Sequence, residues 1–174
     1  MSAHSQGSGP RSNAYSDSKC SNWTLYDPFM MEAHAALKRF DSRLSRSPVF
    51  PRIITIAPIS GYIHACTRQQ IQTRLSKVPA KEIQGLRAVF LLAGTRKQER
   101  SWYSNLGCYG IYMQSCIFLC SHPFRLDRFN LDSLRDFYID DVLIHEVAHH
   151  MDRFRRADHK TREGFANAFV QQSS

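Results

Sequence analysis

The last third of the chain carries the most regular alternation of apolar and polar positions. After Asn130, apolar side chains recur at intervals of three or four residues, which is the spacing of one face of an α-helix. They are Leu134, Phe137, Tyr138, Val142, Leu143, Val147, Met151 and Phe154. Acidic residues gather where this stretch begins and arginines where it ends, an order that suits the helix dipole. The pattern predicts a long helix here and a second helix from about Thr161 to Val170.

Two further helices and one loop are predicted upstream. Apolar residues return at helical spacing after Asp27, whose side chain can cap the first turn, and Pro28 suits the first helical position. Residues 67–75 are mostly polar, with two apolar side chains four positions apart, which indicates a short helix on the surface. The polar run RKQER, residues 96–100, is expected to form a loop.

Four segments have the composition of β-strands. Residues 52–57 are rich in β-branched side chains, and residues 86–94 form an almost continuous apolar run, as in a buried strand. Residues 109–113 and 116–120 are predicted to form a hairpin whose turn lies at Gln114-Ser115. The order is therefore a helix, several strands and two final helices. It predicts an α+β fold in which a small, mostly antiparallel sheet packs against helices.

The composition indicates one globular domain preceded by a tail. Of the 174 residues, 43% are hydrophobic and 22% are charged, which is ordinary for a soluble protein. Residues 1–22 are rich in Ser and have few large apolar side chains, so we expect a disordered tail and a single domain over residues 23–174. No apolar run reaches membrane-spanning length, and the first residues lack the apolar stretch of a secretory signal. These features favour a cytoplasmic protein with no membrane partner.

Cysteine usage and charge add two expectations. The five cysteines are odd in number and show no C-x-x-C spacing, which indicates buried, reduced thiols. The formal net charge is +8, and the excess is spread over residues 38–52, 68–77, 96–100 and 153–162. Such a surface is typical of proteins that bind nucleic acid or another polyanion. An ordinary solvated surface explains the same charge, and no nucleic-acid motif accompanies it.

The segment H-E-V-A-H, residues 145–149, carries the clearest chemistry in the chain. On a helix, His145 and His149 are one turn apart on the same face, where two imidazoles can share one zinc ion. Glu146 is turned by about 100° from His145, so it flanks the ion and need not bind it. From there it can act as general base toward a water molecule whose pKa the metal lowers.

A catalytic zinc site needs a third protein ligand and leaves its fourth position to water. The extended pattern H-E-x-x-H-x-x-G-x-x-H is absent, because Asp152 and Arg155 stand at its last two fixed positions. The ligand must therefore come from further along the chain, and Asp158, His159 and Glu163 are the candidates. Glu163 is favoured because a helix would place it on the same face as a small alanine, which permits close approach to the metal helix.

Other polar residues are expected to support the site. His150 points about 100° away from His149 and is expected to pack or to support a ligand rather than to bind metal. Asp152 either orients the His149 ring from the same face or is an exposed acid. A donor that stabilises an oxyanion is also needed. The candidates are Tyr109, Tyr112, His122 and His159.

The motif H-E-V-A-H-H followed by E-x-x-A-N-x-F resembles the minimal gluzincin metallopeptidases, and its pattern is most similar to the ImmA/IrrE-type proteins. The match covers about residues 142–170. The resemblance implies that His145, His149 and Glu163 hold Zn²⁺, that Glu146 is the catalytic base, and that a short sheet precedes the metal helix. A second resemblance is to SprT-like proteases, which act near DNA, although their usual zinc-ribbon cysteines are missing here.

The gluzincin resemblance also implies an edge strand, residues 109–113 or 116–120, that pairs with an extended substrate. We therefore expect a zinc metalloendopeptidase of narrow specificity acting on a protein or peptide. The alternative is a zinc-containing regulatory or interaction module without catalysis, one that could be associated with DNA. An intact Glu146 favours the enzyme, because a purely structural site has no use for that base.

Overall fold

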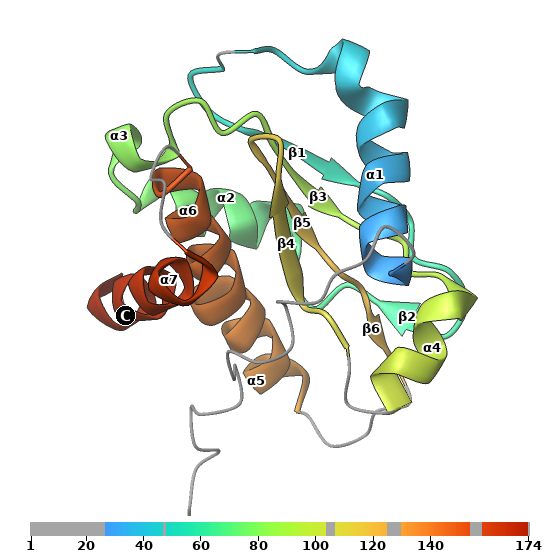
Figure 1. Ribbon diagram of the computed structural model, residues 1–174. Helices are drawn as coiled ribbons and strands as arrows, with labels where there is room; N and C mark the ends of the chain where they lie inside the picture. The colour runs from blue at the N-terminus through green and yellow to red at the C-terminus, as the bar shows by residue number, and fades with distance from the viewer. Residues whose placement is uncertain (1–26, 47, 104–106, 125–129, 154–157, 174) are drawn as a thin grey trace, which may run out of the picture.

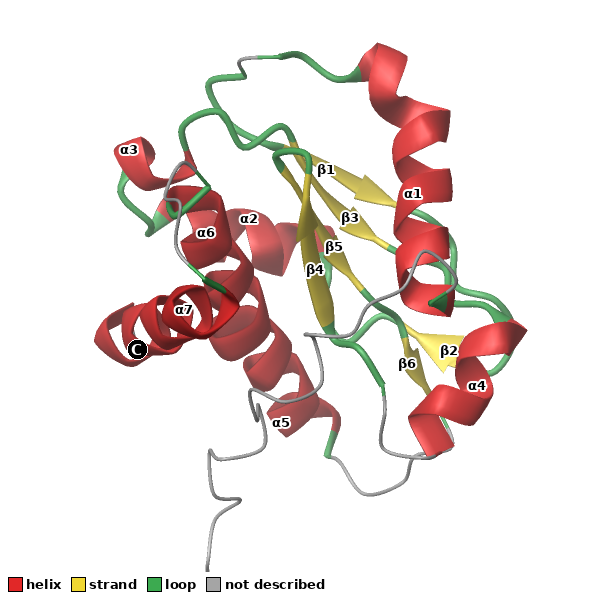
Figure 2. Ribbon diagram, viewed as in Figure 1, coloured by secondary structure: helices red, strands yellow, loops and turns green. Residues whose placement is uncertain are grey.

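Helices lie on both faces of a small central sheet in the computed structural model of the chain (Figures 1 and 2). The structure describes residues 27–46, 48–103, 107–124, 130–153 and 158–173. This arrangement confirms the predicted α+β fold. The predicted tail, residues 1–22, lies outside the described residues.

The central sheet has mixed strand directions. Its order is β1 (Arg52–Thr55), β3 (Ala88–Leu91), β5 (Cys116–Leu119) and β4 (Gly110–Met113). The β1–β3 and β3–β5 pairs are parallel, and only the β4–β5 pair is antiparallel. The prediction of a mostly antiparallel sheet was therefore wrong for this sheet. The long connections from β1 to β3 and from β3 to β5 contain helices, and such crossovers return the chain in the same direction.

Antiparallel pairing is found in the β4–β5 hairpin and in a small second sheet. The hairpin turn lies at Gln114 and Ser115, whose φ angles are 51° and 60°. Two consecutive residues with positive φ are typical of the tight turn whose twist matches the flanking strands, so the predicted hairpin is confirmed. The second sheet pairs β2 (Tyr62–Ile63) with β6 (His122–Pro123).

The helix α1 (Pro28–Phe40) covers one face of the sheet (Figure 1). The Asp27 carboxylate accepts hydrogen bonds from the backbone N–H groups of Phe29 and Met30, so the predicted cap is confirmed. Its apolar side packs on the strands, and a 3₁₀ turn, Asp41–Arg43, follows it.

The helix α4 (Arg96–Tyr103) lies near the lower end of α1 and contains the segment 96–100 that was predicted as a loop. That prediction was wrong. Gln98 and Trp102, four positions apart, are 1% and 3% exposed and form the inward side of this helix. A buried side that consists of one amide and one aromatic residue gives no apolar periodicity for a sequence pattern to detect.

The opposite face of the sheet is covered by α2 (Arg68–Ser76), α3 (Ala80–Ile83), α5 (Leu131–Asp136) and α6 (Leu143–Met151). α2 confirms the short helix predicted there. The segment between α5 and α6, Phe137–Val142, is a π-helix. The predicted long helix is therefore one continuous helical stretch with a wider turn in its middle.

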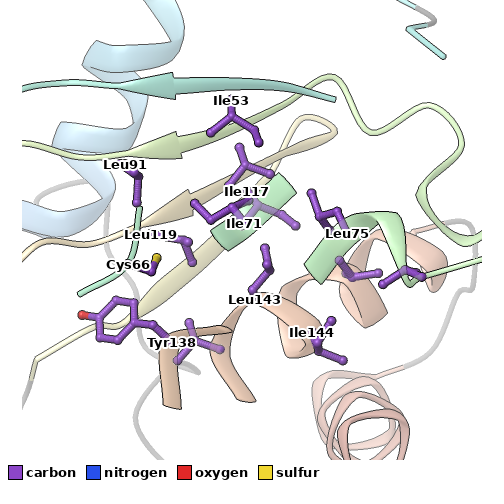
Figure 3. Packing of buried hydrophobic residues seen from close by; sticks show 14 of the residues in the cluster. Ile53, Cys66, Ile71, Leu75, Leu91, Ile117, Leu119, Tyr138, Leu143 and Ile144 are labelled. Atoms are coloured by element: carbon purple, nitrogen blue, oxygen red, sulfur yellow. The ribbon is translucent and has the colours of Figure 1, made fainter. Parts of the chain in front are cut away.

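The helix α7 (His159–Ser173) packs against α6 on the side away from the sheet (Figure 2). Figure 3 shows the core between the sheet and α2, α5 and α6. Its members include Ile53, Ile71, Leu75, Leu91, Ile117, Leu119, Tyr138, Leu143 and Ile144. Each such side chain contributes about 1.5–3 kcal/mol when it leaves water, so α6 is firmly fixed on the sheet. Within the described residues, no helix combines the length and apolar character needed to cross a bilayer.

Cys66, Cys108, Cys116 and Cys120 are buried free thiols, as expected, and Cys20 lies outside the described residues. Burial raises the pKa of Cys66 to about 12 and that of Cys116 to about 11. Protonated, buried thiols of this kind are inert packing residues and not nucleophiles.

Candidate metal centre

The orientation of α6 is set by the residues that it buries. Leu143, Ile144 and Val147 are fully buried in the core, so one side of the helix is committed to the sheet and to α2. His145 and His149 then lie on the side that meets α7. The apolar residues around the histidines therefore determine where the imidazoles point.

Three side chains from α6 and α7 converge on one point. The Nε2 atoms of His145 and His149 are 3.0 Å apart. The Glu163 carboxylate lies 3.2 Å from the His145 Nε2 atom through Oε2 and 3.1 Å from the His149 Nε2 atom through Oε1. Donors bound to a tetrahedral ion at about 2.0–2.1 Å are about 3.3 Å apart, so these three residues fit a divalent metal. The donor set by itself does not single out zinc.

The centre is buried on one side and open on the other. His145 and Glu163 have side chains that are 4% and 8% exposed, whereas that of His149 is 18% exposed. The predicted ligands are thus brought together in a largely buried place of low dielectric, and His149 is the most exposed of the three. Electrostatic interactions between charged groups are strengthened in such a place.

The charges of the three side chains support each other. Burial alone would raise the pKa of Glu163, but hydrogen bonds from His145 and His149 outweigh it and hold that pKa well below its ordinary value. Burial alone would lower the pKa of His149, but its hydrogen bond to Glu163 and the nearby charge of Glu146 raise it. Glu163 is therefore ionised, which is the form in which a carboxylate binds metal.

The first turn of α7 explains why Glu163 is the residue that reaches the histidines. The Asp158 carboxylate accepts a hydrogen bond of 2.8 Å from the backbone N–H of Thr161. Asp158 is thus the exposed cap of α7 and is not among the converging residues, and α7 begins at His159, slightly before the predicted start near Thr161. The side chain of His159, the remaining candidate, lies outside the described residues.

Asp152 links the end of α6 to α7. It is 3% exposed, so the prediction that it is an exposed acid was wrong. Its Oδ2 atom lies 3.5 Å from the Nε atom of Arg162, and its backbone carbonyl accepts a hydrogen bond of 3.3 Å from the same guanidinium. Because Arg162 precedes Glu163, this contact holds the metal-facing turn of α7 against α6.

Glu146 flanks the converging residues and lies against the sheet. Its side chain is 3% exposed and lies beside Gly110, the first residue of β4. A Cβ atom on Gly110 would stand only 2.8 Å from the Glu146 Oε1 atom. Sequence reasoning did not identify Gly110 as part of the site. The signal that could have found it is a glycine at the start of a predicted strand, where glycine commonly marks a close approach.

His150 joins α6 to β4 and to the end of α3. Its Nε2 atom lies 3.0 Å from the carbonyl oxygen of Gln84, and its Nδ1 atom lies 3.1 Å from the hydroxyl of Tyr112. Because a carbonyl can only accept, Nε2 carries the proton and Nδ1 accepts from Tyr112. Both ring nitrogens are thus engaged, and the prediction that His150 packs and is not a ligand agrees with the geometry.

Three of the four candidates for an oxyanion donor have other contacts in the structure, and the side chain of the fourth, His159, lies outside the described residues. The Tyr112 hydroxyl donates to His150, and the buried His122 donates from Nδ1 to the carbonyl of Pro123 at 3.0 Å. Tyr109 packs against the ring of Trp102, and burial raises its pKa.

Two of the four basic segments lie on opposite sides of the sheet. Residues 68–77 belong largely to α2, whereas residues 96–100 belong to α4 on the other face (Figure 1). Arg74 is paired with Asp140 at 2.8 Å and Arg87 with Asp41 at 2.6 Å, which neutralises part of the charge. Binding of nucleic acid stays a prediction.

Comparisons with protein-family models, with curated proteins and with solved structures gave no match for this chain. The gluzincin resemblance therefore stays a prediction that rests on the motif residues and on their spacing.

Proposed function

We propose that this chain is a zinc-dependent peptidase of the gluzincin kind, similar to the ImmA/IrrE-type proteins. His145, His149 and Glu163 would hold the zinc ion, and Glu146 would be the general base. The observation that carries the proposal is the convergence of three side chains, whose donor atoms lie 3.0–3.2 Å apart, next to a second buried glutamate, Glu146, that is not one of the three. Structural zinc sites are closed by four protein ligands, whereas three ligands leave a position open for chemistry.

The bound zinc ion and Glu146 would have different roles in peptide hydrolysis. When bound at such a site, zinc polarises the substrate carbonyl and lowers the pKa of a water molecule. Glu146 accepts the proton of the attacking water at its carboxylate and then donates it to the nitrogen of the leaving amine. Its burial and its position beside Gly110 restrict where the carboxylate can lie.

The edge strand β4 supports a peptide as the substrate. Among the described residues, β5 is the strand that pairs with it, and β4 lies against α6. Cys120 donates its N–H to the carbonyl of Tyr109, and pairing alternates along an antiparallel ladder. The backbone groups of Gly110 and Tyr112 therefore point away from β5, and an extended peptide could pair with them. The Gly110 carbonyl already accepts from the Cys108 thiol at 3.1 Å.

The test compares the wild type with Glu146→Gln. We expect one zinc ion per chain in both proteins, measured by elemental analysis, because Glu146 is not a ligand. Wild-type protein should release new peptides from a proteomic peptide library, and the rate should fall by about 10²–10⁴-fold in Glu146→Gln, the usual contribution of a general base. A zinc chelator should abolish cleavage.

Identical peptide patterns from the two proteins under zinc-replete conditions would contradict the proposal. Zinc bound without cleavage would then favour the regulatory or interaction module. Loss of zinc from Glu146→Gln would show that the roles of ligand and base are wrongly assigned.

A further inference from the structure

The strand β4 and the helix α6 touch at two matched points. Gly110 lies against Glu146, and the Tyr112 hydroxyl bonds the imidazole of His150. The two strand residues are two positions apart, or about 6.8 Å, and the two helix residues are four positions apart, or about 6 Å. The spacings agree, so strand and helix lie side by side in a fixed register.

Space, and not backbone conformation, requires glycine at position 110. Its φ angle is outside the left-handed region that favours glycine. A Cβ atom there would stand 2.7 Å from the Val142 Cγ1 atom, 2.8 Å from the Glu146 Oε1 atom and 3.0 Å from the Glu146 Cγ atom. Glycine weakens a strand, so its presence in β4 calls for a reason, and the reason is the carboxylate that occupies the place of its side chain.

The Tyr112–His150 hydrogen bond prevents β4 from sliding along α6. His150 is fully buried and its other nitrogen is bonded to the Gln84 carbonyl, so the ring cannot turn without losing a second bond. Arg153 adds hydrogen bonds to the carbonyls of His150 and Gln84. Because Tyr112 is held in place, Gly110, which lies two residues before it on β4, is kept beside the side chain of Glu146.

We propose that Gly110 is a positioning residue for Glu146 and that the Tyr112–His150 bond maintains the register that brings the two together. The edge strand β4 limits the positions that the Glu146 carboxylate can take. The inference rests on the proposed function only where it names Glu146 as the base. The placement of the carboxylate is a separate physical statement, and it can be measured without substrate.

The main test pairs Gly110→Ala with Gly164→Ala, since a Cβ atom on Gly164 would meet nothing within 4 Å. The readout is carbon-13 NMR of the side-chain carboxyl groups in protein labelled at glutamate. The sequence has five glutamates, and the Glu146 signal is the one that Glu146→Gln removes. We expect Gly110→Ala to shift that signal and Gly164→Ala to leave it unchanged.

Zinc content and kinetics complete the test. Gly110→Ala should keep one zinc per chain while kcat for peptide cleavage falls by about 100-fold with KM unchanged, because about 1 Å of misplacement costs about that much. If wild-type protein cleaves nothing, the proposed function fails, and the carboxyl signal still decides the role of Gly110. An unmoved Glu146 signal in a folded Gly110→Ala protein would overturn the inference.

A second pair of variants covers the case in which Gly110→Ala does not fold. Tyr112→Phe removes the hydroxyl that bonds His150, and Tyr62→Phe removes one that bonds the Thr95 carbonyl at 3.2 Å. Tyr112→Phe should shift the Glu146 signal and lower kcat severalfold, and Tyr62→Phe should do neither. Equal Glu146 signals in Tyr112→Phe and in the wild type would overturn the role of the register.

Discussion

Two glutamates on opposite sides of the sheet have different partners. Glu32 on α1 accepts hydrogen bonds from the Gly94 N–H at 2.8 Å and from the Gln98 amide at 2.6 Å. Glu163 on α7 instead contacts the imidazole nitrogens of His145 and His149. Both carboxylates tie together segments that are distant in the sequence. Only the second does so through side chains that bind metals.

The partners shift the pKa values of the two carboxyl groups in opposite directions. Burial raises the pKa of Glu32, and the amide donors only partly oppose that effect. Hydrogen bonds from two imidazoles hold the pKa of Glu163 well below its ordinary value in spite of burial. Because its partners are neutral amides, Glu32 has a structural role and links α1 to α4. The Glu163 carboxylate stays charged in a place where a cation would stabilise it further.

The largest effect that sharpens this comparison is expected at the two adjacent histidines of α6. His149→Ala should abolish zinc binding, because it removes one of three converging donors. His150→Ala should keep one zinc per chain while lowering the free energy of unfolding by about 1–3 kcal/mol, since it removes one hydrogen bond of the Tyr112 hydroxyl and one of the Gln84 carbonyl. Elemental analysis and chemical denaturation distinguish the two. If His150→Ala lost zinc and His149→Ala kept it, His150 would be the ligand in place of His149.

The two glutamates provide the next comparison. Glu163→Ala should weaken zinc affinity by more than about 100-fold, because even residues that only support ligands contribute about 10- to 100-fold. Glu32→Ala should leave zinc affinity unchanged and lower the free energy of unfolding by about 1–3 kcal/mol, because it removes the hydrogen bonds from the Gly94 N–H and the Gln98 amide. Competition with a chelating dye measures the affinity. Equal zinc affinities for the two variants would show that Glu163 contributes no more to zinc binding than Glu32 does.

The sequence predicted which three side chains the structure brings together. The four-residue spacing of His145 and His149 and the apolar residues around them are enough to place two imidazoles on one helix face. Glu163 was favoured over Asp158 because a helix places it beside a small residue, and Ala166 is indeed fully buried. Each of these inferences uses residues within one or two turns of helix, where geometry follows directly from sequence separation.

What the sequence did not predict depends on contacts between distant segments. Gly110 and Glu146 are far apart in the chain, and nothing in either segment records that they touch. The parallel pairing of β1 with β3 is also invisible in composition, because a buried apolar run suits either direction. The helix α4 was missed because its inward side is Gln98 and Trp102, and no apolar period marks it.

The smallest expected effect is at Asp158, which caps the helix that carries Glu163. Asp158→Ala should lower the free energy of unfolding slightly, because it removes a capping side chain. Zinc affinity should change by no more than a few-fold, because the contact between Arg162 and Asp152 still holds the first turn of α7 against α6. Thermal denaturation and the chelator competition measure the two quantities in one protein preparation. If Asp158→Ala lost zinc as completely as Glu163→Ala, Asp158 would be a ligand. The exposed cap would then have to move toward the histidines when metal binds, and the gluzincin set of ligands would be wrong.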